Sequence, residues 1–283
     1  MVYSLSHPTE LQGNGVLPIH TKISAVFLDI DGTIVKNGML VPSAKRAVRE
    51  LHQARIPVIL CTGRSVLHTM EIQEELGVSL SVHFNGALAM DSGDAVYRNP
   101  LSKEAVESLA RLAEQFHIPY VLHSEGEAFA IRELPRELNP LLRRYDFPAI
   151  TQKDLGVVLK SGVPVYQVNW FTNEAEDGKL QSRFPACSLN RWDIGGMDIQ
   201  EAGCDKSVAA LAMLDYLGVS PDRALHIGDG TNDIGMFHAM GFSVAMGNAS
   251  HAVQREADWV TATVDEGGVY QALQHLQVLP SVG

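Results

Sequence analysis

Short apolar runs, each closed by turn residues, recur in the first and last thirds of the chain. They cover residues 25–30, 56–61, 224–227 and 242–246, and such runs are typical of buried parallel strands. Apolar residues at helical spacing follow them and predict helices at 44–54, 65–76, 208–217 and 268–276, with an edge strand at 258–260. This alternation of strand and helix predicts an α/β fold with a doubly wound parallel sheet.

The middle of the chain has a different pattern. Residues 87–97 alternate like a hairpin with Ser92-Gly93 at its turn, and residues 102–116 have one apolar helical face. Further strands and helices are predicted at 120–122, 128–131, 138–145, 164–171, 177–184, 188–192 and 197–200. Hairpins mixed with helices suggest an α+β unit inserted into the α/β domain.

We therefore expect three segments. Residues 1–21 have no clear period and form a leader, while residues 22–86 and 191–283 form the core domain. The inserted domain is expected at 87–190, with Asn85-Gly86 as one hinge because glycine absorbs backbone rotation at little steric cost. Between the first strand and helix, residues 38–42 are expected to be a loop, with Ser43 capping the helix.

Composition narrows the function classes. The chain has 283 residues, 46% of them hydrophobic, and a net charge of −11, which argues against nucleic-acid or anionic-membrane binding. Its apolar runs are shorter than the ~20 residues needed to span a bilayer, and no secretory signal is recognisable. The three cysteines have no metal-type spacing. These features favour a reduced, cytoplasmic location.

Polar residues follow the predicted strands where chemistry is expected. Asp29 and Asp31 end the first strand, and Thr62-Gly63 ends the second. In open α/β sheets, ligands bind beyond the carboxyl ends of the strands. Two neighbouring carboxylates repel, and Mg²⁺ with a substrate phosphate would remove that conflict. Each motif alone also fits an ordinary turn.

Two further features belong to the same pattern. Gly228-Asp229-Gly230-Thr231-Asn232-Asp233 makes a tight turn after the third strand. Lys206 lies in the first turn of a predicted helix, where a cation is disfavoured by the helix dipole, so a functional role competes with an exposed surface lysine. His226 lies within an apolar strand and is interpreted as a core histidine.

Together these motifs resemble the haloacid dehalogenase-like superfamily. The matching segments are D-I-D-G-T, T-G-R, the isolated lysine and G-D-G-T-N-D, and the position of the insert resembles the type IIB cap of the Cof-type sugar-phosphate phosphatases. The resemblance covers residue 23 to the C-terminus and is tight in the core, whereas in the cap it is one of architecture. It implies a Mg²⁺-dependent phosphatase that acts on a small phosphorylated metabolite, such as a sugar phosphate.

The resemblance also implies roles for the motif residues. Asp29 would be the nucleophile, forming an aspartyl-phosphate, and a Mg²⁺ ligand. Asp31 would be the general acid and base, and its backbone carbonyl would bind the metal. Asp229 would be the second carboxylate ligand, and Asp233 would hold the metal through water or orient Lys206.

The remaining roles concern the substrate. The phosphoryl oxygens would be bound by Ile30 (through its N–H), Thr62, Gly63, Lys206 and Asn232. Candidates for selecting the leaving group are Asn85, His123, Arg132 and Trp170, although aromatic and arginine side chains are more often structural.

Two alternatives stay open at this point. A phosphomutase of similar architecture would return the phosphoryl group to a sugar, and a non-catalytic metabolite sensor could use the same fold. The G-D-G-x-N-D segment also resembles the hinge of P-type ATPases, but a complete pump needs membrane spans. The identity of the substrate and the oligomeric state do not follow from the sequence.

Overall fold

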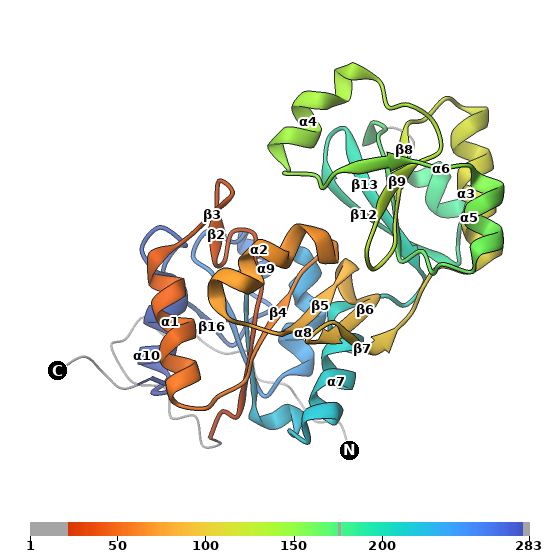
Figure 1. The fold of residues 1–283 in the computed structure, drawn as a ribbon. Helices are drawn as coiled ribbons and strands as arrows, with labels where there is room; N and C mark the ends of the chain where they lie inside the picture. Colours follow the sequence, from red (N-terminus) through yellow and green to blue (C-terminus); the bar gives the residue numbers. More distant parts are fainter. Residues whose placement is uncertain (1–21, 175–176, 280–283) are drawn as a thin grey trace, which may run out of the picture.

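The larger of two main sheets contains the predicted parallel strands (Figure 1). The computed structural model describes residues 22–174 and 177–279, so the expected leader lies outside the described residues. Across the sheet the order is β16 (Trp259–Val260), β15 (Phe242–Ala245), β14 (Ala224–Gly228), β1 (Ala25–Leu28), β4 (Val58–Cys61), β5 (Leu80–His83), β6 (Leu88–Asp91) and β7 (Asp94–Arg98). Strands β16 to β5 pair in parallel, whereas β6 and β7 pair antiparallel. The predicted doubly wound α/β fold is confirmed.

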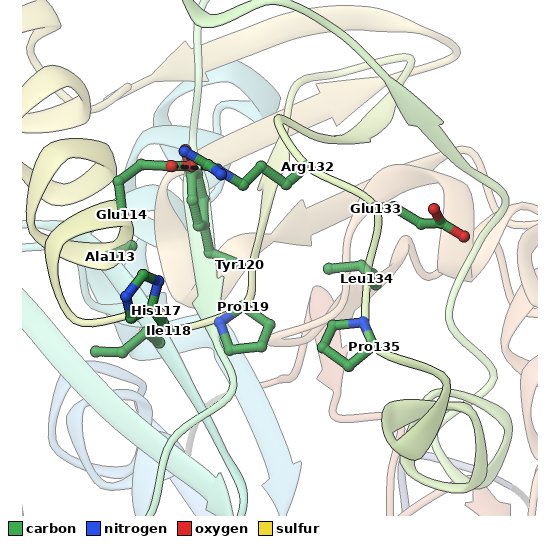
Figure 2. A pocket seen from close by; sticks show the side chains of 10 residues that line it. All are labelled: Ala113, Glu114, His117, Ile118, Pro119, Tyr120, Arg132, Glu133, Leu134 and Pro135. Carbon is green, nitrogen blue, oxygen red and sulfur yellow. Dashed lines mark hydrogen bonds and ion pairs between the residues drawn. The ribbon is translucent and has the colours of Figure 1, made fainter.

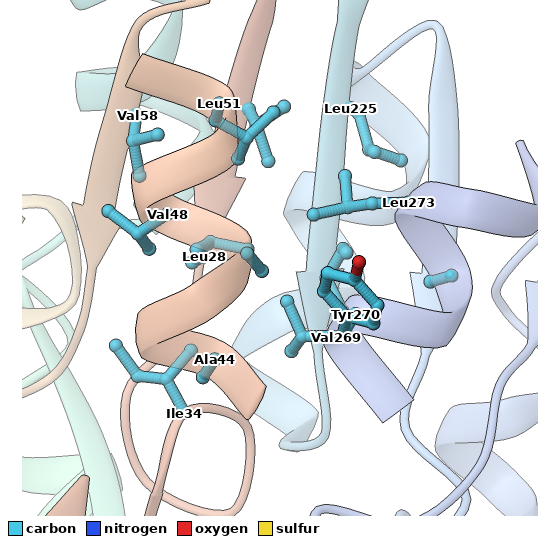
Figure 3. Close-up of a cluster of buried hydrophobic side chains, with 14 of the residues drawn as sticks. Leu28, Ile34, Ala44, Val48, Leu51, Val58, Leu225, Val269, Tyr270 and Leu273 are labelled. Atoms are coloured by element: carbon cyan, nitrogen blue, oxygen red, sulfur yellow. The ribbon is translucent and has the colours of Figure 1, made fainter. Parts of the chain in front are cut away.

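Helices cover both faces of this sheet, and the side-chain alternation along β1 shows how. Val26 and Leu28 belong to an apolar cluster with α1 (Pro42–Gln53), α2 (Val66–Leu76) and α10 (Gly268–His275). Figure 3 shows Leu28 near Val48 and Leu51 of α1, with Leu273 of α10 in the same cluster. Ala25 and Phe27 instead pack with α7 (Lys206–Leu217) and α8 (Ile234–Ala239). Because each face is apolar, the strand ends are left as the polar edge of the sheet.

Local details differ from the sequence prediction between β1 and α1. The expected loop at 38–42 contains β3 (Met39–Leu40), which pairs as a short hairpin with β2 (Val35–Lys36) just before the loop. Helix α1 begins at Pro42 after Val41, so Ser43 is not its N-cap. Proline suits the first helical position because its missing N–H would have no intrahelical partner there. The short helix α9 (His251–Gln254) was also not predicted.

The smaller sheet is mostly antiparallel. Its strand order is β10 (Ile150–Gln152), β9 (Ala128–Ala130), β8 (Tyr120–His123), β11 (Gln167–Trp170), β13 (Gly196–Glu201) and β12 (Cys187–Asp193). One face packs against α3 (Lys103–Gln115), α5 (Leu155–Ser161) and α6 (Asp177–Arg183). On the other face, α4 (Asn139–Arg144) contributes Leu141 to a cluster around Phe171. Strand β10 and helix α5 are additions to the predicted elements.

The strand pairings suggest domain bounds that differ from those expected from sequence. Strands β6 and β7 extend the larger sheet, whereas β13 belongs to the smaller one. The N–H of Asn99 still bonds to Ala87 in the larger unit, but the N–H of Leu101 bonds to Val165 in the smaller. We propose that the chain crosses between domains near residues 99–101 and returns near residues 202–205. No helix in the described ranges is both long and apolar enough to cross a bilayer.

Candidate active site

Three carboxylates meet at the polar edge of the larger sheet. Asp29 directly follows β1, and Asp229 follows the adjacent strand β14. Asp233 lies at the start of α8, one short turn later. One carboxylate oxygen from each of the three lies within 4.8 Å of the others. The structure therefore brings together acidic groups that are about 200 positions apart in the sequence.

Lys206 lies in the middle of this cluster. Its ammonium donates to Asp29 Oδ1 at 2.7 Å and to Asp233 Oδ1 at 2.8 Å, and its side chain is completely buried. It is the first residue of α7, where the Asp205 side chain caps the helix by accepting from the Ser207 N–H. A buried ammonium at a helix N-terminus is unfavourable on its own, so these two carboxylates compensate both its desolvation and the dipole.

The cluster shifts the pKa values of its members in opposite directions. Burial raises the pKa of Asp29 well above its usual range, with Lys206 opposing and Asp233 and Asp229 adding to the rise. Burial and the charge of Asp233 raise the pKa of Asp229 to about 6. For Asp233, burial is outweighed by Lys206 and His226, which hold its pKa below the usual range. For Asp29 and Asp229, the positive charge of Lys206 thus does not fully offset the effects of burial and of the neighbouring carboxylates.

This donor set fits a divalent cation. Three carboxylates share a single buried ammonium, so the site carries excess negative charge. Mg²⁺ prefers oxygen ligands and one or two carboxylates. Asp233 already accepts from Lys206 and His226 at Oδ1 and from the N–H groups of residues 229 and 230 at Oδ2. Its oxygens are therefore committed to protein donors, and Asp29 and Asp229 are the better candidates for direct ligands.

Asp229 is held in place by two features that the sequence analysis did not use. Gly32 has a left-handed φ of +76°, and a Cβ there would lie 2.1 Å from Asp229 Oδ2. Glycine is thus required both for the turn after Asp31 and for the approach of Asp229. The Asn248 amide donates to Asp229 Oδ2 at 3.0 Å and to the Gly32 carbonyl at 2.9 Å. Its only signal in the sequence is that Gly247-Asn248 follows a strand.

Asp31 does not join the carboxylate cluster. Its two oxygens accept from Arg64 Nε at 2.8 Å and Arg64 Nη2 at 2.7 Å, and its side chain is 62% exposed. Arg64 also donates to the backbone carbonyl of His68. Burial lowers the pKa of Arg64, but the Asp31 hydrogen bonds and charge raise it overall, with Asp146 of the smaller domain contributing. Arg64 is thus the main partner of Asp31, a role that the sequence analysis missed.

The residues expected to bind phosphate line the same edge. Thr62 is buried, and its hydroxyl accepts from the Arg64 N–H at 3.1 Å. The Asn232 amide donates to Asn85 Oδ1 at 2.9 Å. A Cβ on Gly63 would lie 2.8 Å from that same oxygen, so Gly63 allows the Asn85 side chain to lie against it. Asn85 therefore belongs to the core part of the site, and the Ile30 side chain is buried in the core cluster.

His226 is a core histidine, as interpreted, but it also supports the site. Its Nε2 lies 3.0 Å from Asp233 Oδ1, and its ring is completely buried. Burial lowers the pKa of His226 despite the neighbouring Asp233, so the ring is neutral at pH 7 and donates from Nε2. It therefore helps to hold Asp233 toward Lys206.

In the smaller domain, His123 begins a row of buried polar side chains. His123 Nε2 bonds to Asn169 Oδ1, and the Asn169 amide donates to Asp198 Oδ1. Gln200 donates to Gln167 Oε1 at 2.7 Å next to them. These five residues, on β8, β11 and β13, are called the cap polar row. Burial raises the pKa of Asp198 to about 8 and lowers that of His123 to about 4.

The other two cap candidates are placed differently. Arg132 forms an ion pair with Glu114 at an outer pocket whose lining residues all lie within 113–135 (Figure 2). Trp170 is completely buried in the apolar cluster under α3, α5 and α6, against Phe184. Because alternate residues of β11 face opposite sides, Trp170 lies on the helix-covered face and Asn169 on the polar one. Neither Arg132 nor Trp170 is brought to the carboxylate cluster.

Comparison with known proteins gives consistent matches along nearly the whole described chain. A model of the haloacid dehalogenase-like hydrolase family matches residues 26–273. YkrA of Bacillus subtilis (strain 168), provisionally named a phosphatase, is 30% identical over 257 residues, covering 90% of this chain and 98% of YkrA. YcsE of the same organism, a 5-amino-6-(5-phospho-D-ribitylamino)uracil phosphatase, is 25% identical, covering 89% and 95%.

Among solved structures, the subclass IIB sugar phosphatase BT4131 has a similar fold. Its TM-score is 0.80 at 25% identity, and the match covers 92% of this chain and 100% of BT4131. The agreement therefore includes both the larger and the smaller domain.

We predict that Lys206→Met lowers the free energy of unfolding by about 3–5 kcal/mol, because it leaves two buried carboxylates without their cation. Urea unfolding in the presence of EDTA measures the change. Lys160→Met, at an exposed lysine of α5, is the control and should stay within about 0.5 kcal/mol of wild type. Equal stability of the two variants would contradict the compensation argument.

We predict that Asp198 makes the fold less stable as pH rises. Its pKa is about 8 in the folded protein and about 3.9 when unfolded, so the folded state binds the extra proton between these values. The free energy of unfolding should then fall from about pH 4 to pH 8 in wild type relative to Asp198→Asn. The buried His123 makes the free energy of unfolding rise with pH below about pH 6.5. This contribution is present in wild type and in the variant, so it cancels when the two free energies are subtracted. Parallel stability curves from urea unfolding would show that Asp198 is already ionised in the fold.

Proposed function

We propose a reaction for this chain, which belongs to the haloacid dehalogenase-like hydrolase family. It hydrolyses the monophosphate ester of a small metabolite, in particular a sugar phosphate, through an aspartyl-phosphate on Asp29. The observation that carries the proposal is the buried contact of Lys206 with Asp29, at a strand end that Asp229 also reaches. The sugar-phosphatase structure with a similar fold supports the substrate class.

In the first step, an Asp29 carboxylate oxygen attacks phosphorus, and the bond to the leaving oxygen breaks. Asp31 gives its proton to that oxygen as the alcohol departs. In the second step, water attacks the phosphorus of the aspartyl-phosphate and passes a proton to Asp31, while the bond between phosphorus and the Asp29 oxygen breaks. Inorganic phosphate leaves, the Asp29 carboxylate is restored and Asp31 is again an acid. Splitting the reaction in this way lowers each barrier relative to direct attack by water.

The surrounding residues explain how an anion can approach a phosphate dianion. Lys206 places its positive charge 2.7 Å from Asp29 Oδ1, and Asp233 and His226 keep it there. The site fits Mg²⁺, which would be held by Asp29, Asp229 and the Asp31 backbone carbonyl. When bound, it supplies the positive charge that offsets the repulsion between nucleophile and phosphate. Thr62, Gly63, Asn232 and the Ile30 N–H would bind the phosphoryl oxygens.

Asp31 must change partners during this cycle. Here it forms two hydrogen bonds with Arg64, one at each carboxylate oxygen, and we propose that one of these bonds opens when Asp31 turns toward the leaving oxygen. Its high exposure leaves room for that movement. Arg64 thus holds the acid–base residue at the rim between turnovers.

The state of the cysteines bears on the location of the protein. All three cysteines are free thiols in the structure, which supports a reduced compartment such as the cytoplasm. The acidic net charge argues against a nucleic-acid partner.

A phosphomutase is the second candidate function. Addition of a sugar bisphosphate distinguishes the two activities, because a mutase needs this activator whereas a phosphatase releases phosphate without it.

We predict that Asp29→Asn lowers Mg²⁺-dependent release of phosphate from p-nitrophenyl phosphate by at least about 10³-fold, because an amide cannot act as the nucleophile. The variant keeps the size of the side chain that Lys206 contacts. Asp215→Asn, at an exposed carboxylate on α7, is the matched control and should retain wild-type activity. Equal rates in wild type and Asp29→Asn would reject Asp29 as the nucleophile.

We predict that removing metal with EDTA abolishes activity and that Mg²⁺ restores it. In addition, Mg²⁺ should raise the melting temperature of wild type because it binds the folded state, whose carboxylates are already assembled. Asp229→Asn should reduce this rise, since it removes the negative charge of one of the two proposed side-chain ligands. A rise of the same size in the variant would show that the ion binds elsewhere.

A further inference from the structure

His123 has a buried nitrogen with no partner in the described part of the chain. The Asn169 amide donates to Asp198, so its oxygen faces His123 and can only accept. With the Asn169 amide in this orientation, His123 Nε2 carries the ring proton and Nδ1 is a bare acceptor. That atom is buried and unpartnered, and the residue is 1% exposed. Such a group costs about 1–3 kcal/mol and is rare in folded proteins.

The position of His123 suggests what its free nitrogen could bind. Its ring centroid lies 6.2 Å from that of Phe84 and 6.2 Å from that of Phe147. Phe84 directly precedes Asn85, which bonds to Asn232 in the active site. Phe147 follows α4 and also contacts His68 of the larger domain, at 5.3 Å between centroids. His123 therefore lies where the two domains meet, beside the catalytic edge.

Phe147 occupies the space between these two histidines. His68 belongs to the segment whose backbone binds Arg64, the partner of Asp31. On the proposed mechanism Asp31 protonates the leaving oxygen, so the leaving group would lie near Asp31 and its partner Arg64. Phe147 is only partly buried and lies in the connection between α4 and β10, so it can move aside without unfolding a helix or strand.

We propose that His123 determines specificity for the leaving group, accepting at Nδ1 a hydrogen bond from a substrate hydroxyl after Phe147 moves aside. Asn169 and Asp198 are positioning residues that fix the His123 tautomer. This inference rests on the proposed phosphatase function and specifies its substrate. The cap polar row offers neutral groups and one carboxyl group, so it fits the hydroxyls of a sugar or polyol monophosphate and disfavours a second phosphate.

The test compares two substrates in the full-length enzyme with Mg²⁺. Ribitol 5-phosphate offers hydroxyls, whereas p-nitrophenyl phosphate offers none. The measured quantity is the ratio of kcat/KM for the first substrate to that for the second. We expect His123→Phe to lower this ratio about 10–100-fold, the effect of losing one hydrogen bond to a buried group. His123→Asn, whose amide oxygen can replace Nδ1, should recover most of the loss.

Controls separate this proposal from structural effects and from the proposed function. His52→Phe, an exposed histidine of α1, should leave the ratio unchanged. An unchanged ratio in His123→Phe, or an equal loss in His123→Asn, would overturn the role of Nδ1. If wild type hydrolyses neither substrate nor a wider panel of sugar phosphates, the proposed function itself fails.

A second variant tests the displacement without altering His123. Phe147→Ala removes the ring that the substrate would have to displace, so KM for ribitol 5-phosphate should fall about 3-fold or more. A rise in KM would show that Phe147 contacts the substrate where it stands and that the proposed movement is wrong.

Discussion

The structure of the active site depends on one buried ammonium. Lys206 contacts Asp29 and Asp233 with no exposure to solvent, and its charge opposes the effect of burial on the pKa of both carboxylates. The contact also joins three segments of the fold, because Asp29 follows β1, Lys206 begins α7 and Asp233 directly precedes α8. The packing of α7 against the sheet therefore places the Lys206 ammonium beside the nucleophile Asp29. A change in that packing would move this positive charge away from Asp29.

A second constraint is how closely the backbone must approach these charged groups. A Cβ on Gly32 would overlap the Asp229 carboxylate, and one on Gly86 would lie 2.0 Å from the Asp205 carbonyl, directly before Lys206. Both glycines also have positive φ. Glycine is therefore needed at these two positions for two physical reasons: the backbone has a positive φ, and there is no room for a side chain.

Much of the fold and of the active site could be predicted because the sequence patterns that indicate them are local. The apolar strands and the polar residues that end them indicated the α/β fold, the family and its phosphatase class, which are confirmed. The features that the sequence did not place depend on partners that are far apart in sequence. The hairpin at β6 and β7 has the alternation of any antiparallel pair, and nothing local shows which sheet it extends. Arg64 and Asn248 were missed because their partners, Asp31 and Asp229, lie 33 and 19 positions away. Trp170 was named for its residue type, but the alternation along β11 turns it into the apolar cluster.

The two movements required by the proposed mechanism share one chain of contacts. In the proposed mechanism Asp31 opens a hydrogen bond to Arg64 as it turns toward the leaving oxygen, and Arg64 donates to the His68 carbonyl. The His68 ring packs on Phe147, which the leaving group would displace. A phosphate ester that reaches His123 therefore disturbs the same segment that holds Arg64 and, through it, Asp31. Inorganic phosphate, which has no leaving group, would leave Phe147 and the Arg64–Asp31 pair in place. On this mechanism, entry of a leaving group favours the release of the acid that must protonate it.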